Sequence, residues 1–221
     1  IISMISYPDF NLNKREKIDD TDYINRATKG VYELGSVFKT FTIAAGLDAG
    51  LIEPETEFFN LEKKLDCGKS TITEYDNKIL SDLTVEEILI KSGNIGSVRI
   101  GQMLEIEGLK SFLEKIGVSH KIDFDIEEVG EPIPFKWGKC KLATVSFGHG
   151  ITTTPLQLAK AYAIISNGGF EINPTLIKDR SKNNKKRIIK KNTSKAINLI
   201  LRKIVLEAVS YTHLRAHETD S

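Results

Sequence analysis

The sequence is poor in the features that mark several classes of protein. It has only 2 cysteines among 221 residues, Cys67 and Cys140, which is too few for a disulfide framework, and neither belongs to a Cys-x-x-Cys pair. A net charge of +1 gives no electrostatic argument for nucleic-acid binding. No apolar run approaches the roughly 18 residues that cross a bilayer. With 40% hydrophobic and 28% charged residues, the chain has the composition of a globular enzyme or binding module.

The two ends of the chain differ from the middle. Residues Ile1–Ser6 alternate weakly in hydropathy, which predicts a strand, and no charged leader precedes them, so we interpret the chain as beginning inside a domain. Residues 209–221 resemble translated adaptor sequence, and we expect 1–208 to be the natural part of the chain, a partial domain. His213 and His217 have metal-binding spacing on a helix, but a structural zinc site takes about four ligands, so we expect no metal there.

Apolar periodicity and capping signals predict several helices between the ends. Residues 36–49 would be apolar on most faces of a helix, which predicts a buried helix that ends at Gly50. Thr84 begins one helix as a capping box, and Thr154-Pro155 begins another that ends at Gly168-Gly169. Apolar periodicity also predicts helices over 95–106, 109–116 and 192–208. We expect loops with short strands over 51–82 and a loop over 118–140.

A strongly basic segment precedes the last predicted helix. Residues 177–191 hold eight Lys or Arg against one acid, Asp179. Such a run is usually a solvated loop or hairpin tip. A contact with an anionic surface is the alternative.

The only Ser-x-x-Lys in the chain lies at the start of the predicted buried helix. Three residues are nearly one helical turn, so Ser36 and Lys39 project from one face. A nucleophilic serine needs a base in contact, and a lysine taken out of water at the positive end of a helix has a lowered pKa. These residues therefore predict a nucleophile and its base. The structural alternative is a helix cap beside a snorkelling lysine.

A Ser-x-Asn follows between two predicted helices, at Ser92-Gly93-Asn94. A hydroxyl with an amide two residues away can pass a proton and hold a peptide carbonyl. The alternative is a linking turn, which these residue types favour. A three-residue pattern is a weak signal, because two other segments compete for the same role: Ser181-Lys182-Asn183 and Tyr75-Asp76-Asn77.

Together, these motifs resemble those of the penicillin-recognising serine enzymes. Within that group the chain is most similar to class B penicillin-binding proteins, in particular the cell-division (FtsI) type of peptidoglycan D,D-transpeptidase. The similarity runs from about Ile1 to Ala208. It is carried by the segments that read ISYPDF from Ile5, NRA from Asn25, GVYELGS from Gly30, and SFGHG and TPLQ from Ser146 and Thr154.

The resemblance implies a fold and a reaction. The fold would be α/β (α+β), serine β-lactamase/transpeptidase-like, with an antiparallel sheet flanked by helices and an all-helical part carrying Ser92. The reaction would be acyl transfer from D-alanyl-D-alanine stem peptides through Ser36, with Lys39 as base, Ser92 as proton relay and Asn94 orienting substrate and Lys39. No metal or cofactor would be needed. β-Lactams would acylate Ser36, and the implied partners are a membrane peptidoglycan glycosyltransferase and divisome proteins.

One part of the family pattern is missing. The third motif, Lys-Thr-Gly on a strand after the helix that ends near Ala208, does not occur in the sequence. In the family this strand supplies part of the oxyanion hole, and losing one such donor costs ~10²–10³ in rate. We therefore expect these 221 residues to be an incomplete and nearly inactive transpeptidase domain.

Two other functions share the implied fold. A serine β-lactamase would also activate a deacylating water, for which the sequence offers no strong general base. A non-catalytic β-lactam sensor would keep the acylation of Ser36 without crosslinking stem peptides. The implied location is the bacterial inner membrane, with the catalytic domain in the periplasm.

Overall fold

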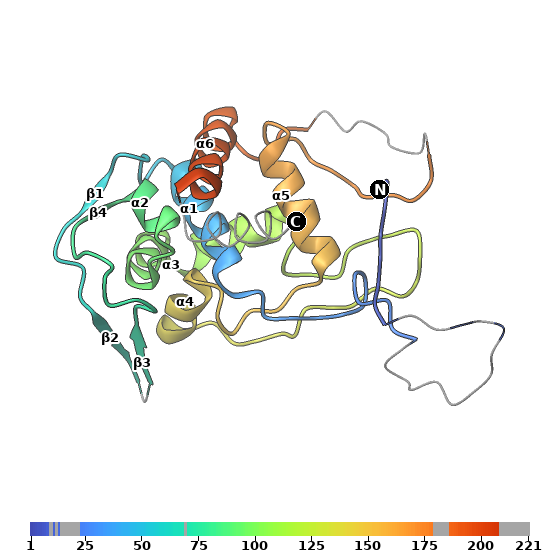
Figure 1. Cartoon of the computed structure of the whole chain (residues 1–221), viewed down its shortest axis with the longest axis horizontal. Helices are drawn as coiled ribbons and strands as arrows, with labels where there is room; N and C mark the ends of the chain where they lie inside the picture. The colour runs from blue at the N-terminus through green and yellow to red at the C-terminus, as the bar shows by residue number, and fades with distance from the viewer. Residues whose placement is uncertain (9–10, 12, 14–22, 69, 179–185, 208–221) are drawn as a thin grey trace, which may run out of the picture.

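The computed structural model describes the whole chain except residues 9–10, 12, 14–22, 69, 179–185 and 208–221 (Figure 1). Within the described residues, a short 3₁₀ helix, six α-helices and four short strands follow one another. In chain order they are η1 Gly35–Phe38, α1 Lys39–Ala49, β1 Glu57–Phe58, β2 Lys64–Cys67, β3 Ser70–Thr73, β4 Leu83–Thr84, α2 Val85–Ile90, α3 Asn94–Ile116, α4 Lys139–Ser146, α5 Pro155–Ser166 and α6 Lys191–Glu207.

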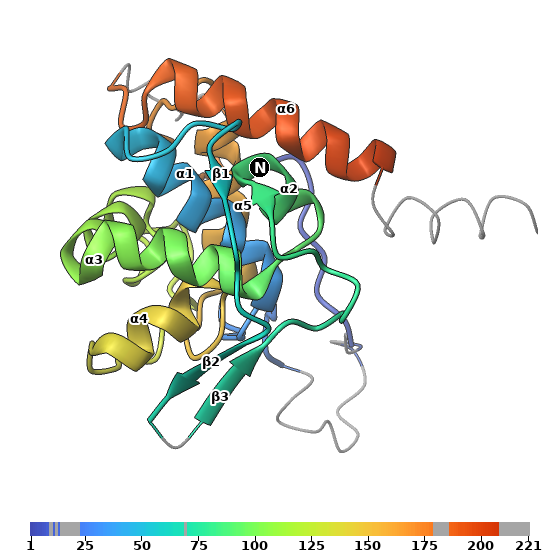
Figure 2. The ribbon, with the colours of Figure 1, turned by 90° about the vertical axis from the view of Figure 1, so that its left-hand side faces the viewer.

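Helix α1 occupies the centre of the molecule. In Figure 2, α4, α3, α1 and α6 lie one above another, with α1 between α3 and α6. Phe41, Ile43 and Ala44 of α1 are completely buried, as expected for a helix that is apolar on most sides. The predicted buried helix is confirmed, and its first turn is the 3₁₀ helix η1.

The strands form two small antiparallel sheets at one side of the helices (Figures 1 and 2). Glu57 pairs with Thr84 between β1 and β4, and Lys64 pairs with Thr73 in the β2–β3 hairpin. The short strands predicted over 51–82 are therefore present. The described residues contain no sheet larger than two strands, so the fold is a mixture of helices with small antiparallel sheets.

Local capping chemistry fixes the helix ends where the sequence predicted. Thr84 and Thr154 each form a complete capping box, with Glu87 and Gln157 respectively. Gly50 ends α1 with a φ of 74°, a left-handed conformation that glycine adopts without steric cost.

The helices predicted over 95–106 and 109–116 correspond to two helices that α3 joins at a kink, where Glu105 takes a non-helical φ of 58°. One predicted loop boundary differs from the structure. Helix α4 begins at Lys139, inside the segment over 118–140 that was predicted as a loop, and continues past the end of that segment. It has few apolar residues to reveal it, since only its Leu142, Ala143 and Val145 are buried hydrophobics.

The predicted strand over Ile1–Ser6 is wrong. Ile2 and Ile5 are fully or mostly exposed, and no described residue pairs with this segment in a ladder. Its amino terminus instead donates one hydrogen bond to the Thr175 carbonyl at 2.7 Å. A strand needs a hydrogen-bonded neighbour, which weak alternation in six residues does not guarantee.

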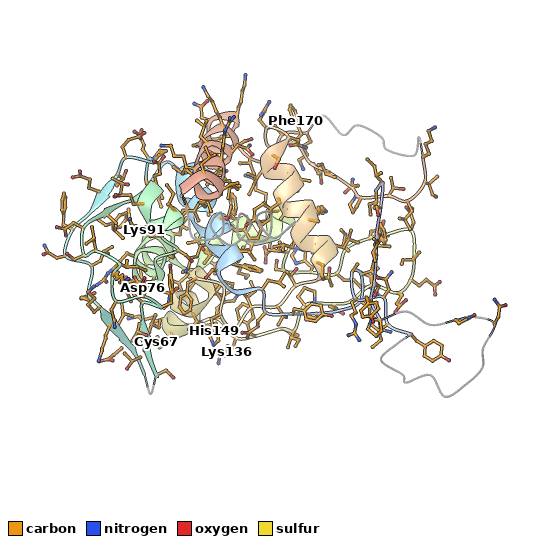
Figure 3. All side chains as sticks on the ribbon, viewed as in Figure 1. Cys67, Asp76, Lys91, Lys136, His149 and Phe170 are labelled. Carbon is orange, nitrogen blue, oxygen red and sulfur yellow. A yellow bond between two sulfur atoms is a disulfide. The ribbon has the colours of Figure 1, made fainter. Side chains whose placement is uncertain are left out.

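The two cysteines of the chain, Cys67 and Cys140, form a disulfide bond. Cys67 ends β2, and Cys140 lies in the first turn of α4 (Figure 3). The bond therefore ties the β2–β3 hairpin to a helix 73 residues further along the chain. A count of two excludes a framework of several bridges but not a single one.

This disulfide should contribute measurably to stability. Because it closes a long loop, its loss gives the unfolded chain more conformational freedom. We expect Cys140→Ser to lower the free energy of unfolding by about 2–4 kcal/mol, a typical contribution. Urea denaturation of the oxidised protein and the variant measures the difference, and equal midpoints would contradict this expectation.

The ends of the basic segment fold onto the helices. The Arg187 guanidinium lies 4.1 Å from the centroid of the ring of Phe170, which Figure 3 labels, and Ile188 and Ile189 are buried. Residues 179–185, including the competing Ser181-Lys182-Asn183, lie outside the described residues, as do His213 and His217. The predicted helix over 192–208 is confirmed as α6. Among the described residues, no helix has the length and apolar character needed to span a membrane.

Candidate active site

Ser36 and Lys39 meet at the first turn of the central helix. The 3₁₀ geometry of η1 has three residues per turn, so side chains three apart are aligned. Lys39 Nζ lies 3.2 Å from Ser36 Oγ and donates a hydrogen bond to it. The contact that the spacing predicted is therefore present.

Ser92 reaches the same amine from the turn between α2 and α3. Lys39 Nζ donates to Ser92 Oγ at 2.8 Å and also to the Ser92 carbonyl oxygen. Ser92 has a φ of 54°, which is uncommon for a residue other than glycine and carries a cost of order 1–3 kcal/mol. Two serine hydroxyls that are 56 residues apart in the sequence thus share one buried lysine.

The protonation of Lys39 is set by its surroundings. Lys39 is 0% exposed, and burial lowers its pKa to about 8, while the negative charge of Glu74 acts in the opposite direction. As an ammonium, Lys39 has acceptors for all three of its protons: Ser36 Oγ, Ser92 Oγ and the Ser92 carbonyl. As a neutral amine it has a lone pair, to which a serine hydroxyl can donate.

Asn94 lies beside the cluster, but its side chain points elsewhere. Its Nδ2 donates to the Thr73 carbonyl at the end of β3, at 2.8 Å. No hydrogen bond among the described residues joins Asn94 to Lys39, so the structure differs from the prediction that Asn94 orients this amine. The amide instead fastens the turn to the neighbouring hairpin.

Glu74 is a residue of the site that sequence reasoning missed. It follows β3 directly, and its two oxygens accept hydrogen bonds from the backbone N–H groups of Asn94 and Ile95, at 2.6 and 2.8 Å. Gly93, the N-cap of α3, has no side chain with which to cap the helix. Because Glu74 lies 20 residues before Asn94, no local sequence signal revealed this contact.

Tyr162, on α5, contacts the helical turn that carries Ser36. Its hydroxyl oxygen lies 2.9 Å from both the Val37 carbonyl oxygen and Thr40 Oγ1. Burial raises the pKa of Tyr162, and the hydrogen bond with Thr40 partly opposes this. The sequence placed Tyr162 on a helix but gave no reason to expect this contact.

The 147–150 segment packs against Gly35, the residue before Ser36. A Cβ atom on Gly148 would lie 1.9 Å from the Gly35 carbonyl oxygen, and Gly148 has a φ of 88°. Next to it, His149 Nδ1 lies 3.4 Å from a Glu33 carboxylate oxygen. Glycine at 148 therefore allows the backbone approach that holds the Ser36 turn in place.

Ser36 and Ser92 both line a cavity of about 620 Å³. Its walls come from the loop after β3, the end of α2, α5 and α6, and include Tyr75, Leu89, Tyr162 and Leu201. Asp76 and Lys91, labelled in Figure 3, also line it. The competing Tyr75-Asp76-Asn77 thus contributes to the cavity wall without a hydrogen bond to Lys39 among the described contacts.

This arrangement suits nucleophilic chemistry on a bound carbonyl compound. A hydroxyl at the cavity surface contacts a buried amine whose pKa is close to neutrality, and a second hydroxyl contacts the same amine. Such a nucleophile–base–third-group relay is typical of serine acyl-transfer enzymes.

Known proteins share this sequence and fold. The family model of the penicillin-binding protein transpeptidase domain matches residues 1–217. The chain is 34% identical over 179 residues to a probable peptidoglycan D,D-transpeptidase FtsI of Caulobacter vibrioides, covering 80% of this chain and 30% of that protein. It is 29% identical over 204 residues to a probable peptidoglycan D,D-transpeptidase PenA of Neisseria flavescens, covering 91% and 50%.

A solved structure agrees with these relatives. The TP domain of penicillin-binding protein 3 from Burkholderia pseudomallei superposes with a TM-score of 0.74 at 25% identity, over 82% of this chain and 56% of that one. The chain thus spans from under a third to half the length of these two curated relatives. Since the family model matches nearly every residue, the chain belongs to the transpeptidase domain family of serine-type penicillin-binding proteins.

Proposed function

We propose that this chain carries the acylation centre of a peptidoglycan D,D-transpeptidase of the cell-division type. The observation that carries the proposal is the single buried amine of Lys39 in hydrogen-bond contact with Ser36 Oγ and Ser92 Oγ. Similarity to the probable peptidoglycan D,D-transpeptidase FtsI of Caulobacter vibrioides supports the cell-division type.

In the proposed first half-reaction, Ser36 Oγ attacks the carbonyl of the D-alanyl-D-alanine bond of a stem peptide. Its proton passes to neutral Lys39 Nζ, and the carbonyl becomes a tetrahedral oxyanion. Ser92 relays a proton from Lys39 to the departing amine, so that D-alanine leaves and an acyl-Ser36 ester remains. This route uses the two hydrogen bonds of Lys39.

In the second half-reaction, an amine of a neighbouring stem peptide attacks the ester. That amine loses a proton to the Lys39–Ser92 pair, and Ser36 recovers its own as the crosslink forms. We assign Asn94 to the substrate backbone, for which its amide would leave the Thr73 carbonyl. A β-lactam would acylate Ser36 in the same way.

Mass spectrometry of the intact protein with benzylpenicillin tests this function. We expect the mass of one added penicillin, located by peptide mapping on Ser36. Ser36→Ala should prevent the adduct, whereas Ser70→Ala, at an exposed serine on β3, should not. An adduct elsewhere, or none after long incubation, would contradict the proposal.

The same experiment separates the alternative functions. A transpeptidase or a sensor keeps the adduct, whereas a β-lactamase would hydrolyse it and release penicilloate steadily. Transfer of the acyl group to an added D-amino acid distinguishes a transpeptidase from a sensor. Steady hydrolysis of penicillin would contradict the transpeptidase proposal and favour a β-lactamase.

We propose an inner-membrane protein whose transpeptidase domain lies in the periplasm. The Cys67–Cys140 disulfide supports this location, because such bonds persist in oxidising compartments. A membrane peptidoglycan glycosyltransferase and divisome proteins are the proposed partners. The finer fold proposal is a helical part that carries Ser92 beside a larger antiparallel sheet.

A further inference from the structure

Glu74 is the described carboxylate that connects the β2–β3 hairpin with the catalytic cluster. It accepts two backbone hydrogen bonds at the start of α3, and Asn94 returns one from its side chain to Thr73. These three bonds bind the end of β3 to Asn94 and Ile95, two and three residues after Ser92. A carboxylate at a helix N-terminus is stabilising because the unpaired N–H groups point toward it.

The turn that Glu74 holds is the one that presents Ser92. Ser92 is in a left-handed conformation, and its hydroxyl and carbonyl oxygens both accept from Lys39. A backbone in an unfavourable region persists only when its surroundings hold it there. The Gly93 carbonyl also accepts from buried Ser97 at 2.7 Å, which secures the other side of the turn.

Glu74 also acts on Lys39 through its charge. Its negative field raises the pKa of the Lys39 amine, which burial lowers. Other charged groups make no described hydrogen bond to Lys39. Asp76, Lys78 and Lys91 line the cavity, and Glu33 and His149 form a pair near η1.

We propose that Glu74 is a positioning residue for acylation of Ser36: through its two hydrogen bonds to the backbone of Asn94 and Ile95 it holds the Ser92 turn against Lys39. The proposal rests on the proposed function. Glu74 does not touch the reacting atoms, and it acts through the backbone of Asn94 and Ile95 and through its field at Lys39.

Glu74→Gln separates these effects from a purely structural one. Glutamine keeps the shape of glutamate but has only one acceptor oxygen, whereas the backbone N–H groups of Asn94 and Ile95 each need an acceptor. The maximal acylation rate should therefore fall about tenfold or more. Without the negative charge the pKa of Lys39 falls, so the rise of the acylation rate with pH should move to lower pH. A merely structural residue would lower the maximal rate without moving the midpoint.

Two further variants act as controls. Glu74→Asp retains the charge, and its midpoint should stay close to that of the unmodified protein, even where its shorter side chain lowers the rate. Glu87→Gln removes a carboxylate from the capping box of α2, which also accepts glutamine. It should change neither the midpoint nor the maximal rate.

NMR titration of the Lys39 side chain keeps this proposal distinct from the proposed function. The resonance reports the pKa of the amine whether or not penicillin reacts. If the unmodified protein forms no adduct, the proposed function fails. If Glu74→Gln leaves the Lys39 titration unchanged, or leaves the acylation rate of a reactive protein unchanged, the role of Glu74 is wrong.

Discussion

Lys39→Met should reduce the rate of Ser36 acylation by about 10²–10⁴, the usual contribution of a positioned general base. Methionine fills the same buried volume without an amine, so Ser36 Oγ loses its proton acceptor and Ser92 loses its donor. The rate of adduct formation, followed by intact mass, measures the effect. Lys160→Met is a matched control, because burial also lowers the pKa of Lys160, whose Nζ lies near Gly117 on the far end of α3.

The same variant should keep its fold. Below pH 8 the folded protein carries the cost of a buried ammonium, about 3 kcal/mol from the difference between a pKa of about 8 and the ordinary 10.5. Methionine removes this cost but also removes hydrogen bonds, a loss of about 1–3 kcal/mol. These terms offset one another, so we expect the free energy of unfolding near pH 7 to change by less than about 2 kcal/mol. Loss of acylation through unfolding would contradict this account.

The stability of the two proteins should also respond differently to pH. Because the pKa of Lys39 is lowered on folding, the unfolded chain holds the lysine proton more tightly. The penalty on folding is complete below pH 8 and fades as the pH rises toward 10.5. The Lys39 contribution therefore favours the folded state increasingly over this range, and Lys39→Met lacks that increase.

Gly148→Ala should destabilise the fold by about 2–5 kcal/mol, since strain at a positive φ costs about 1–2 kcal/mol and overpacking about 1–3 kcal/mol. The added Cβ would lie 1.9 Å from the Gly35 carbonyl oxygen, so one backbone segment must move. That movement displaces Ser36, the next residue, and we expect acylation to fall at least tenfold. Urea denaturation and the rate of adduct formation measure the two effects.

Gly138→Ala is the matched control for this substitution. Gly138 has an extended φ of −177°, and no atom lies within 4 Å of the position of an added Cβ. Its free energy of unfolding should change by less than about 1 kcal/mol, the scale of an unstrained glycine substitution. If both variants lost the same stability, contact with Gly35 would not explain the effect at Gly148.

Features governed by neighbouring residues were predictable from the sequence. The capping boxes at Thr84 and Thr154 depend on residues three apart, and both are present. The contact between Ser36 and Lys39 has the same three-residue range. Short-range backbone geometry determines such contacts, so their residue types and spacing suffice to predict them.

Contacts between distant segments were not predictable by the same means. The Cys67–Cys140 bond, the cap that Glu74 gives to α3 and the approach of Gly148 to Gly35 each join segments that only the tertiary fold brings together. Ser92 was selected through family resemblance, and its distance from Lys39 follows from the packing of α1 against α3. The strand predicted over Ile1–Ser6 failed for the same reason, because pairing depends on a partner elsewhere in the chain.

The central claim is that the amine between Ser36 and Ser92 loses its proton close to neutral pH. NMR titration of the Lys39 side chain in the unmodified protein, assigned by the signal missing from Lys39→Met, measures this directly. The structure predicts a midpoint at about pH 8. A midpoint near the ordinary lysine value of 10.5 would contradict the account, because the amine would then remain an ammonium at the pH where Ser36 must give up its proton.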